Sequence, residues 1–199
     1  MIKKGDKKII RGWVFYDWAN SVYNLVISSA IFPIFYDTVT TNAYLKREGM
    51  EVLGDSSDVT VEFFGNLISP SVLMSFVLSA SFLVVSFLSP MLSGIADFSG
   101  NKKRFMQLFC YLGAFSCISL FWFNAERIEL GMLSLFLASI GFWNSLVFYN
   151  AYLPEIAEPK DHDRISAKGF TMGYLGSMIL LVICLAMIMF IDKGLTKYS

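Results

Sequence analysis

Residues 63–96 read FFGNLISPSVLMSFVLSASFLVVSFLSPMLSGIA, and these 34 residues contain no charged side chain. A helix needs about 20 mostly apolar residues to cross the hydrocarbon core of a bilayer, which is about 30 Å thick. In lipid the backbone must satisfy its polar groups internally, so such a stretch crosses the membrane as a helix. This segment therefore predicts a membrane-spanning helix.

Four further stretches of 19 to 25 residues also lack charge, and they cover most of the remaining chain. The composition agrees, because only 16% of the 199 residues are charged and 55% are hydrophobic, whereas soluble domains carry about 25% charged residues. We predict an all-α polytopic membrane protein in which residues 1–199 form one transmembrane domain. The five expected spans lie near residues 12–36, 69–96, 105–123, 130–153 and 169–191.

Basic residues are distributed unevenly around these spans. Eleven of the 16 Lys and Arg residues precede the first span or lie in the links after the second and fourth spans. Positive charge is enriched on the cytoplasmic side of membrane proteins. The sequence therefore predicts an integral protein of a cytoplasmic or inner membrane, with its N-terminus in the cytoplasm and residues 37–66 outside.

Motifs for catalysis and metal binding are absent from the sequence. It contains one histidine, His162, and three cysteines that all fall inside expected spans, so no cluster of metal ligands is expected. It contains no P-loop, GxSxG or HExxH motif. The 16 basic and 16 acidic residues cancel, which gives no signal for a nucleic-acid partner. We expect no enzyme activity, no metal, no cofactor and no nucleic-acid partner, with the lipid bilayer as the surroundings.

Polar side chains occupy one face of the first span. At about 100° per residue, Asp17, Asn20, Ser21, Asn24 and Ser28 fall within an arc of about 100°. Such a face either lines a water-filled cavity or forms a hydrogen-bonded seam between helices. Asp17 has a further interpretation, in which the positive end of the helix stabilises its carboxylate without any function. The candidates for cavity lining are Asp17, Asn20, Asn24 and Asn150.

Small and polar residues on other spans follow helical spacing. Gly169, Gly173 and Ser177 are four residues apart and predict close helix contact. On the fourth span, Asn144 and Asn150 do not share one face with Tyr149, so at least one of the three needs a partner outside a common cavity. A row of serines on the second span favours packing over cavity lining; its members are Ser71, Ser75, Ser79, Ser86, Ser89 and Ser93.

The link after the second span reads SGIADFSGNKKR over residues 93–104. Its glycines permit a tight turn, and Asp97 stands just before a basic cluster, which fits either a plain cytoplasmic anchor or a charge pair that locks and releases. The segment resembles the signature G-x-L-A-D-R-x-G-R-[RK] of the major facilitator superfamily. Ala96, Asp97, Gly100 and Lys102 match it, whereas the residues at 93, 98 and 101 depart from it.

Two other segments narrow this resemblance. Residues 13–21 read WVFYDWANS and residues 148–157 read FYNAYLPEIA. Both are similar to the vacuolar effluxer-like branch of the superfamily, which is related to the autophagy-associated amino-acid effluxer. The resemblance implies twelve spans in two six-helix halves, with the substrate held between the halves. This chain would supply five helices of the N-terminal half, and its partners would be a small-molecule solute and the C-terminal half.

The resemblance also implies a function for the links. The candidates for a cytoplasmic gate are Asp97, Gly100, Lys102, Lys103, Arg104, Glu155 and Arg164. We therefore expect the N-terminal part of a secondary active transporter that moves a small solute by alternating access, and the resemblance suggests amino acids as that solute. The alternative is a non-transporting truncated membrane protein or an assembly subunit. In either case we expect these 199 residues alone not to transport.

Overall fold

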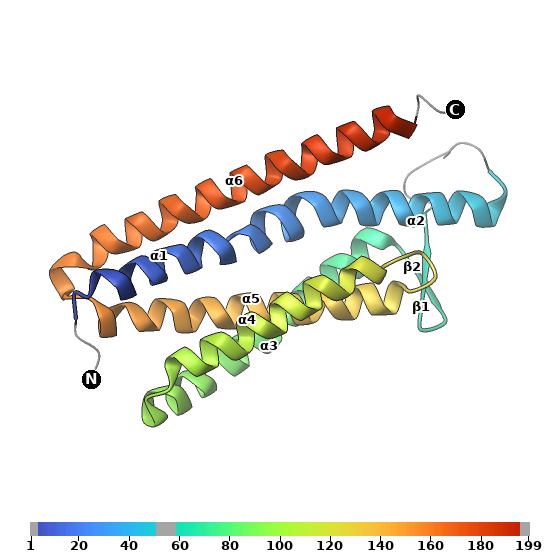
Figure 1. The fold of residues 1–199 in the computed structure, drawn as a ribbon. Helices are drawn as coiled ribbons and strands as arrows, with labels where there is room; N and C mark the ends of the chain where they lie inside the picture. The colour runs from blue at the N-terminus through green and yellow to red at the C-terminus, as the bar shows by residue number, and fades with distance from the viewer. Residues whose placement is uncertain (1–3, 51–58, 196–199) are drawn as a thin grey trace. The chain divides into compact units, whose positions relative to one another are not determined.

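The computed structural model describes residues 4–50 and 59–195, which form two compact units (Figure 1). One unit contains the residues up to Pro33 and those from Leu153 onward, and the other contains Ile34–Tyr152. The described residues include five helices that are long and apolar enough to cross a membrane, and these confirm the predicted fold class. They are Lys7–Glu48, Pro70–Phe98, Lys102–Trp122, Ile128–Ile156 and Pro159–Phe190.

The first of these helices changes its hydrogen-bonding pattern midway. It consists of α1 (Lys7–Asn20), the π-helix η1 (Tyr23–Ile31) and α2 (Phe32–Glu48). In η1 the bonds reach back five residues, as when the N–H of Phe32 donates to the Ile27 carbonyl. A π-helix turns less per residue than an α-helix. The angular spacing assumed for the polar face therefore does not hold beyond Asn20.

The same helix continues well past residue 36, where the sequence placed the end of the first span. Its 42 residues would extend about 60 Å at the α-helical rise, roughly twice the thickness of a hydrocarbon core. Lys46 and Arg47 lie in its last turn, where positive charge is favourable, and Gly49 then adopts a φ of 68°. A charged residue can end a membrane span without ending the helix, so the expected outer link begins as helix.

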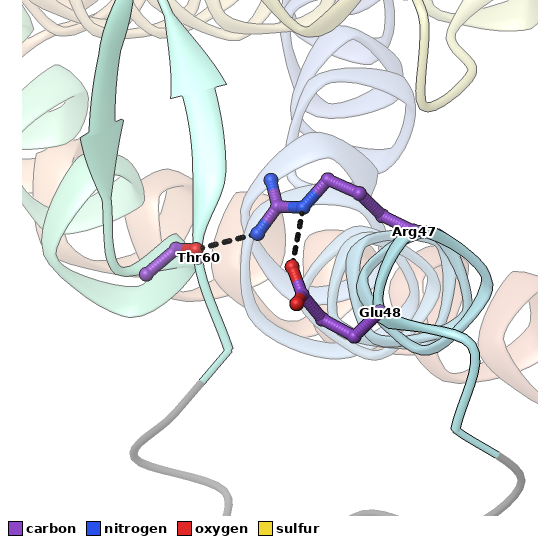
Figure 2. Close-up of polar contacts among 3 residues, drawn as sticks. All are labelled: Arg47, Glu48 and Thr60. Atoms are coloured by element: carbon purple, nitrogen blue, oxygen red, sulfur yellow. Dashed lines mark hydrogen bonds and ion pairs between the residues drawn. The ribbon is translucent and has the colours of Figure 1, made fainter.

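A short hairpin follows the first helix. Strand β1 (Val61–Phe63) pairs antiparallel with β2 (Asn66–Ile68), with Val61 opposite Ile68. Arg47, at the end of α2, donates from Nη2 to the hydroxyl of Thr60 at 2.9 Å and from Nε to Glu48 at 3.0 Å (Figure 2). These exposed contacts join the end of α2 to the residue just before the hairpin.

Three helices form the core of the unit Ile34–Tyr152: α3 (Pro70–Ser99), α4 (Lys102–Ser119) with its extension η3 (Leu120–Trp122), and α5 (Ile128–Ile156). Ala96, Phe109, Ile140 and Phe148 are buried together at their centre. Helices α4 and α5 cross closely at two glycines. A Cβ atom added at Gly141 would lie 2.5 Å from the Gly113 nitrogen, so only glycine permits this approach.

Hydrogen bonds between side chains link α5 to its neighbours in this unit. The hydroxyl of Ser81 donates to Ser139 at 2.7 Å, and that of Ser89 donates to the fully buried Asn144 at 3.1 Å. We expected at least one of the three polar residues of the fourth span to have a partner outside a common cavity. Asn144 has such a partner in Ser89. Four members of the serine row, at 71, 75, 79 and 86, are exposed in this unit, so packing by them stays a prediction. The buried serine of α3, Ser81, lies off that row.

In the other unit, α1 and α6 (His162–Leu195) run side by side, and the short helix η4 (Pro159–Asp161) leads into α6 (Figure 1). Gly169, Gly173 and Ser177 of α6 are buried. A Cβ atom added at Gly176 would lie 2.5 Å from the Trp18 carbonyl oxygen. The small residues of the fifth span therefore form a close helix contact, as predicted.

Candidate functional site

Asp17 is enclosed between α1 and α6. It is 4% exposed, and its carboxylate accepts a hydrogen bond from the hydroxyl of Ser21, one turn later, at 3.1 Å. Gly173 of α6 lies against the same groups, because a Cβ atom added there would be 2.6 Å from Ser21 Oγ and 3.2 Å from Asp17 Oδ2. The glycine thus leaves the room that the buried carboxylate occupies.

The helix terminus does not account for this carboxylate. Helix α1 begins at Lys7, so Asp17 lies almost three turns inside it, whereas the effect of a helix terminus is confined to about the first turn. The interpretation in which Asp17 is stabilised by the positive end of the helix therefore does not apply. A carboxylate buried within a membrane span is costly and marks a candidate functional group.

The structure brings only part of the predicted polar face together. Ser21 contacts Asp17, and Asn20 is half-buried. Asn24 lies in η1 and is exposed, and its backbone carbonyl accepts a hydrogen bond from Ser29 at 2.8 Å. The fourth candidate, Asn150, is exposed on α5 in the other unit. Asp17 and Ser21 bond to each other within one helix, so the choice between a seam and a cavity wall stays open, and exposure leaves Asn24 and Asn150 able to face a cavity.

The link between α3 and α4 is a tight turn closed by an ion pair. The N–H of Gly100 donates to the Asp97 carbonyl at 3.4 Å, and that of Asn101 donates to the Ala96 carbonyl at 3.3 Å, which is the Schellman pattern of a helix end. Gly100 has a φ of 65°, which an L side chain rarely adopts. The turn brings Lys102 Nζ to 2.7 Å from the Asp97 carboxylate.

The remaining gate candidates lie in two places. Lys103 and Arg104 are exposed in the first turn of α4. Glu155 and Arg164 belong to the other compact unit, where Arg164 pairs with Asp161 at 2.8 Å. The Asp97–Lys102 pair is therefore formed within its own link, and a contact from this link to Glu155 or Arg164 stays a prediction.

Sequence reasoning missed several contacts that shape these units. The Gly113–Gly141 crossing was not singled out, although small residues within spans are the usual signal for close helix contact. The pairing of Arg164 with Asp161 was also missed. It depends on helical geometry between the two residues, and that part of the link, which begins at Pro159, was not predicted to be helical.

Comparison with known proteins gives a consistent result. The family described as vacuole effluxer Atg22 like matches residues 5–197. The chain is 32% identical over 177 residues to the uncharacterized MFS-type transporter YxiO of Bacillus subtilis, covering 89% of this chain and 37% of that protein. It is 24% identical over 171 residues to autophagy-related protein 22 of Pyricularia oryzae, covering 80% of this chain and 25% of that protein.

A second fungal relative extends the comparison. The chain is 25% identical over 179 residues to autophagy-related protein 22 of Gibberella zeae, covering 86% of this chain and 27% of that protein. The chain thus spans between a quarter and slightly more than a third of the length of these curated relatives. No solved structure matches it.

The family match extends over nearly the whole chain, and it includes the three segments whose residues carried the resemblance. The five long apolar helices agree with an integral membrane protein of this kind. The chain therefore belongs to the vacuole effluxer Atg22-like family, within the major facilitator superfamily.

Proposed function

We propose that this chain is part of the N-terminal half of a secondary transporter that moves a small solute by alternating access. The observation that carries the proposal is the family match over residues 5–197, supported by a relative whose name describes an MFS-type transporter. In such transporters the substrate binds near the middle of the membrane, between two helical repeats that rock about it. Amino acids are the first solutes to test, because the family resemblance points to an amino-acid effluxer.

Within this proposal the polar residues of the first helix divide into two roles. Asn24 is exposed in η1 and lines the solute cavity, together with Asn20 and with Asn150 of α5. Asp17 and Ser21 bond to each other within the first helix and lie against Gly173 of α6, so Asp17 serves the packing of α1 on α6. The π-helical turn supports this division, since such turns are frequent at functional sites.

The inner gate of the proposed transporter uses the turn between α3 and α4. In one state the Asp97–Lys102 pair is closed, as the structure has it. Because the pair is partly exposed, with 62% of the Asp97 side chain accessible, it is weak enough to exchange partners. Glu155 and Arg164 are the proposed alternative partners during the rocking motion, together with Lys103 and Arg104.

The cavity role of Asn24 can be tested by substitution in the full-length transporter. Asn24→Leu should reduce transport at least severalfold with near-normal membrane insertion, because leucine favours insertion but cannot hydrogen-bond a polar solute. Ala19→Leu is the matched control, since Ala19 is exposed on α1, is not among the proposed cavity residues and receives the same side chain. Equal transport by both variants would contradict the cavity role.

A non-transporting role stays the second candidate, in which the helices pack against another protein as those of an assembly subunit. This alternative predicts no solute flux in any combination with a C-terminal half.

A further inference from the structure

A cleft of about 510 Å³ lies in the unit formed by α1 and α6. Its walls are the first turns of α1 on one side and η4 with the first turns of α6 on the other. Both helices begin at this end of the unit (Figure 1). Neither the proposed solute cavity nor the proposed gate uses the cleft as a whole, so it requires its own explanation.

Basic side chains dominate the charge of this cleft. Lys7 and Arg11 line it from α1, and Arg164 and Lys168 line it from α6. Each pair is spaced by four residues, which places both of its members on one side of their helix. All four residues are exposed, so their charged groups can reach a ligand in the cleft.

Two acidic side chains, Glu158 and Asp161, also line the cleft. Asp161 is already engaged by Arg164, whose Nη2 lies 2.8 Å from its carboxylate. The four basic residues therefore exceed the acidic ones by two, and the cleft is complementary to an anion carrying one or two negative charges.

The lining becomes apolar along both helices in the same direction. On α1, Val14 and Phe15 follow Arg11, and on α6, Met172 follows Lys168 by one turn. Phe15 is 53% exposed, so an apolar surface of the first helix is open beside the charged end. A free phosphate would be complementary only to the charged part of this cleft.

We propose that the cleft binds one anionic phospholipid. The phosphate of the headgroup lies between the two basic pairs, and an acyl chain runs along Phe15 and Met172 toward the middle of the membrane. Basic pockets between membrane helices are suited to such headgroups, and each Lys or Arg near the membrane surface adds about 1 kcal/mol of attraction for anionic lipid. The bound lipid would stabilise the pairing of α1 with α6.

The test is native mass spectrometry of the purified 199-residue chain in detergent, with phosphatidylglycerol and phosphatidylcholine supplied in equal amounts. The chain should retain one phosphatidylglycerol in clear preference to phosphatidylcholine. In the double variant Arg11→Gln/Lys168→Gln that preference should fall roughly 30-fold, which corresponds to the loss of two basic residues. A second double variant, Lys7→Gln/Arg11→Gln, should show a similar loss from one wall of the cleft.

The control removes the same charge elsewhere. Lys46→Gln/Arg127→Gln changes two exposed basic residues outside the cleft and should keep the wild-type preference. Glycerol phosphate in millimolar excess should not displace the lipid, because it lacks the acyl chains. Equal retention of both lipids by the wild-type chain would overturn the proposal, as would an equal loss in the control variant. Displacement of the lipid by glycerol phosphate would instead assign the cleft to a soluble anion, and this result would also overturn the lipid proposal.

Discussion

Gly176 determines how closely α1 and α6 approach each other. Its missing side chain leaves room for the Trp18 carbonyl oxygen, which a Cβ atom would meet at 2.5 Å. A neighbouring backbone cannot rotate away as a flexible side chain can, so a methyl group here would force the two helices apart. The spacing of Gly169, Gly173 and Ser177 predicted a close helix contact on this side of α6, but not the contact of Gly176 with Trp18.

We therefore expect Gly176→Ala to lower the stability of the chain by about 1–3 kcal/mol, the usual cost of overpacking. Gly12→Ala is the matched control, because among the described residues no atom lies within 4 Å of a Cβ added there. It should leave stability unchanged or raise it slightly, since alanine favours helix more than glycine does. Thermal unfolding in detergent measures both variants. A Gly176→Ala protein as stable as the Gly12→Ala protein would show that α1 and α6 do not pack in this way.

At the scale of helices, hydropathy predicted which segments form helices. It did not predict where a helix changes its hydrogen-bonding pattern or where it ends. Tyr23–Ile31 contains neither glycine nor proline, and the one local signal is Pro33 in the first turn of α2, which cannot donate a bond to the Ser29 carbonyl. The α-helical spacing that placed Asn24 on one face with Asp17 therefore does not apply within η1, where Asn24 is exposed and Val26 is buried. The extension of α2 to Glu48 was missed for a different reason, since charge limits a membrane span but not a helix.

At the crossing of α4 and α5, the two glycines differ in how much space a Cβ atom would have. A Cβ atom at Gly141 would meet three backbone atoms within 2.8 Å, whereas one at Gly113 would meet backbone atoms only at 3.6 Å or more. Gly141→Ala should therefore destabilise the chain by about 1–3 kcal/mol, and Gly113→Ala should be tolerated at the same crossing. Thermal unfolding of the two variants in the same detergent tests this. Equal effects would contradict the asymmetry of the crossing.

At the scale of the whole molecule, the orientation in the membrane rests on the distribution of basic residues. Labelling with an impermeant thiol reagent tests it, in a background that lacks the native cysteines. Lys46→Cys, exposed at the end of α2, should be labelled in intact cells. Lys103→Cys should be labelled only after permeabilisation. Position 103 is chosen over position 102, because Lys102 is paired with Asp97 and largely covered. The opposite pattern would reverse the orientation.

The fold class and family could be predicted from sequence because long charge-free stretches and three short motifs carry them. The site could be predicted only in part. Asp97 and Lys102 were correctly placed near each other by their spacing in the turn, and the structure pairs them. The enclosure of Asp17 depends instead on Gly173, which lies more than 150 residues later in the chain, and a periodicity within one helix carries no information about such a neighbour.

We propose that this chain supplies one part of a transporter whose solute site needs two halves. The most direct measurement is uptake of labelled amino acids into vesicles containing either the purified 199-residue chain or the same chain extended by the C-terminal half. We predict no saturable flux above empty vesicles for the chain alone and saturable flux for the extended protein. Saturable flux from the chain alone, or none from the extended protein with any solute tested, would show that the solute site does not need the two halves as proposed.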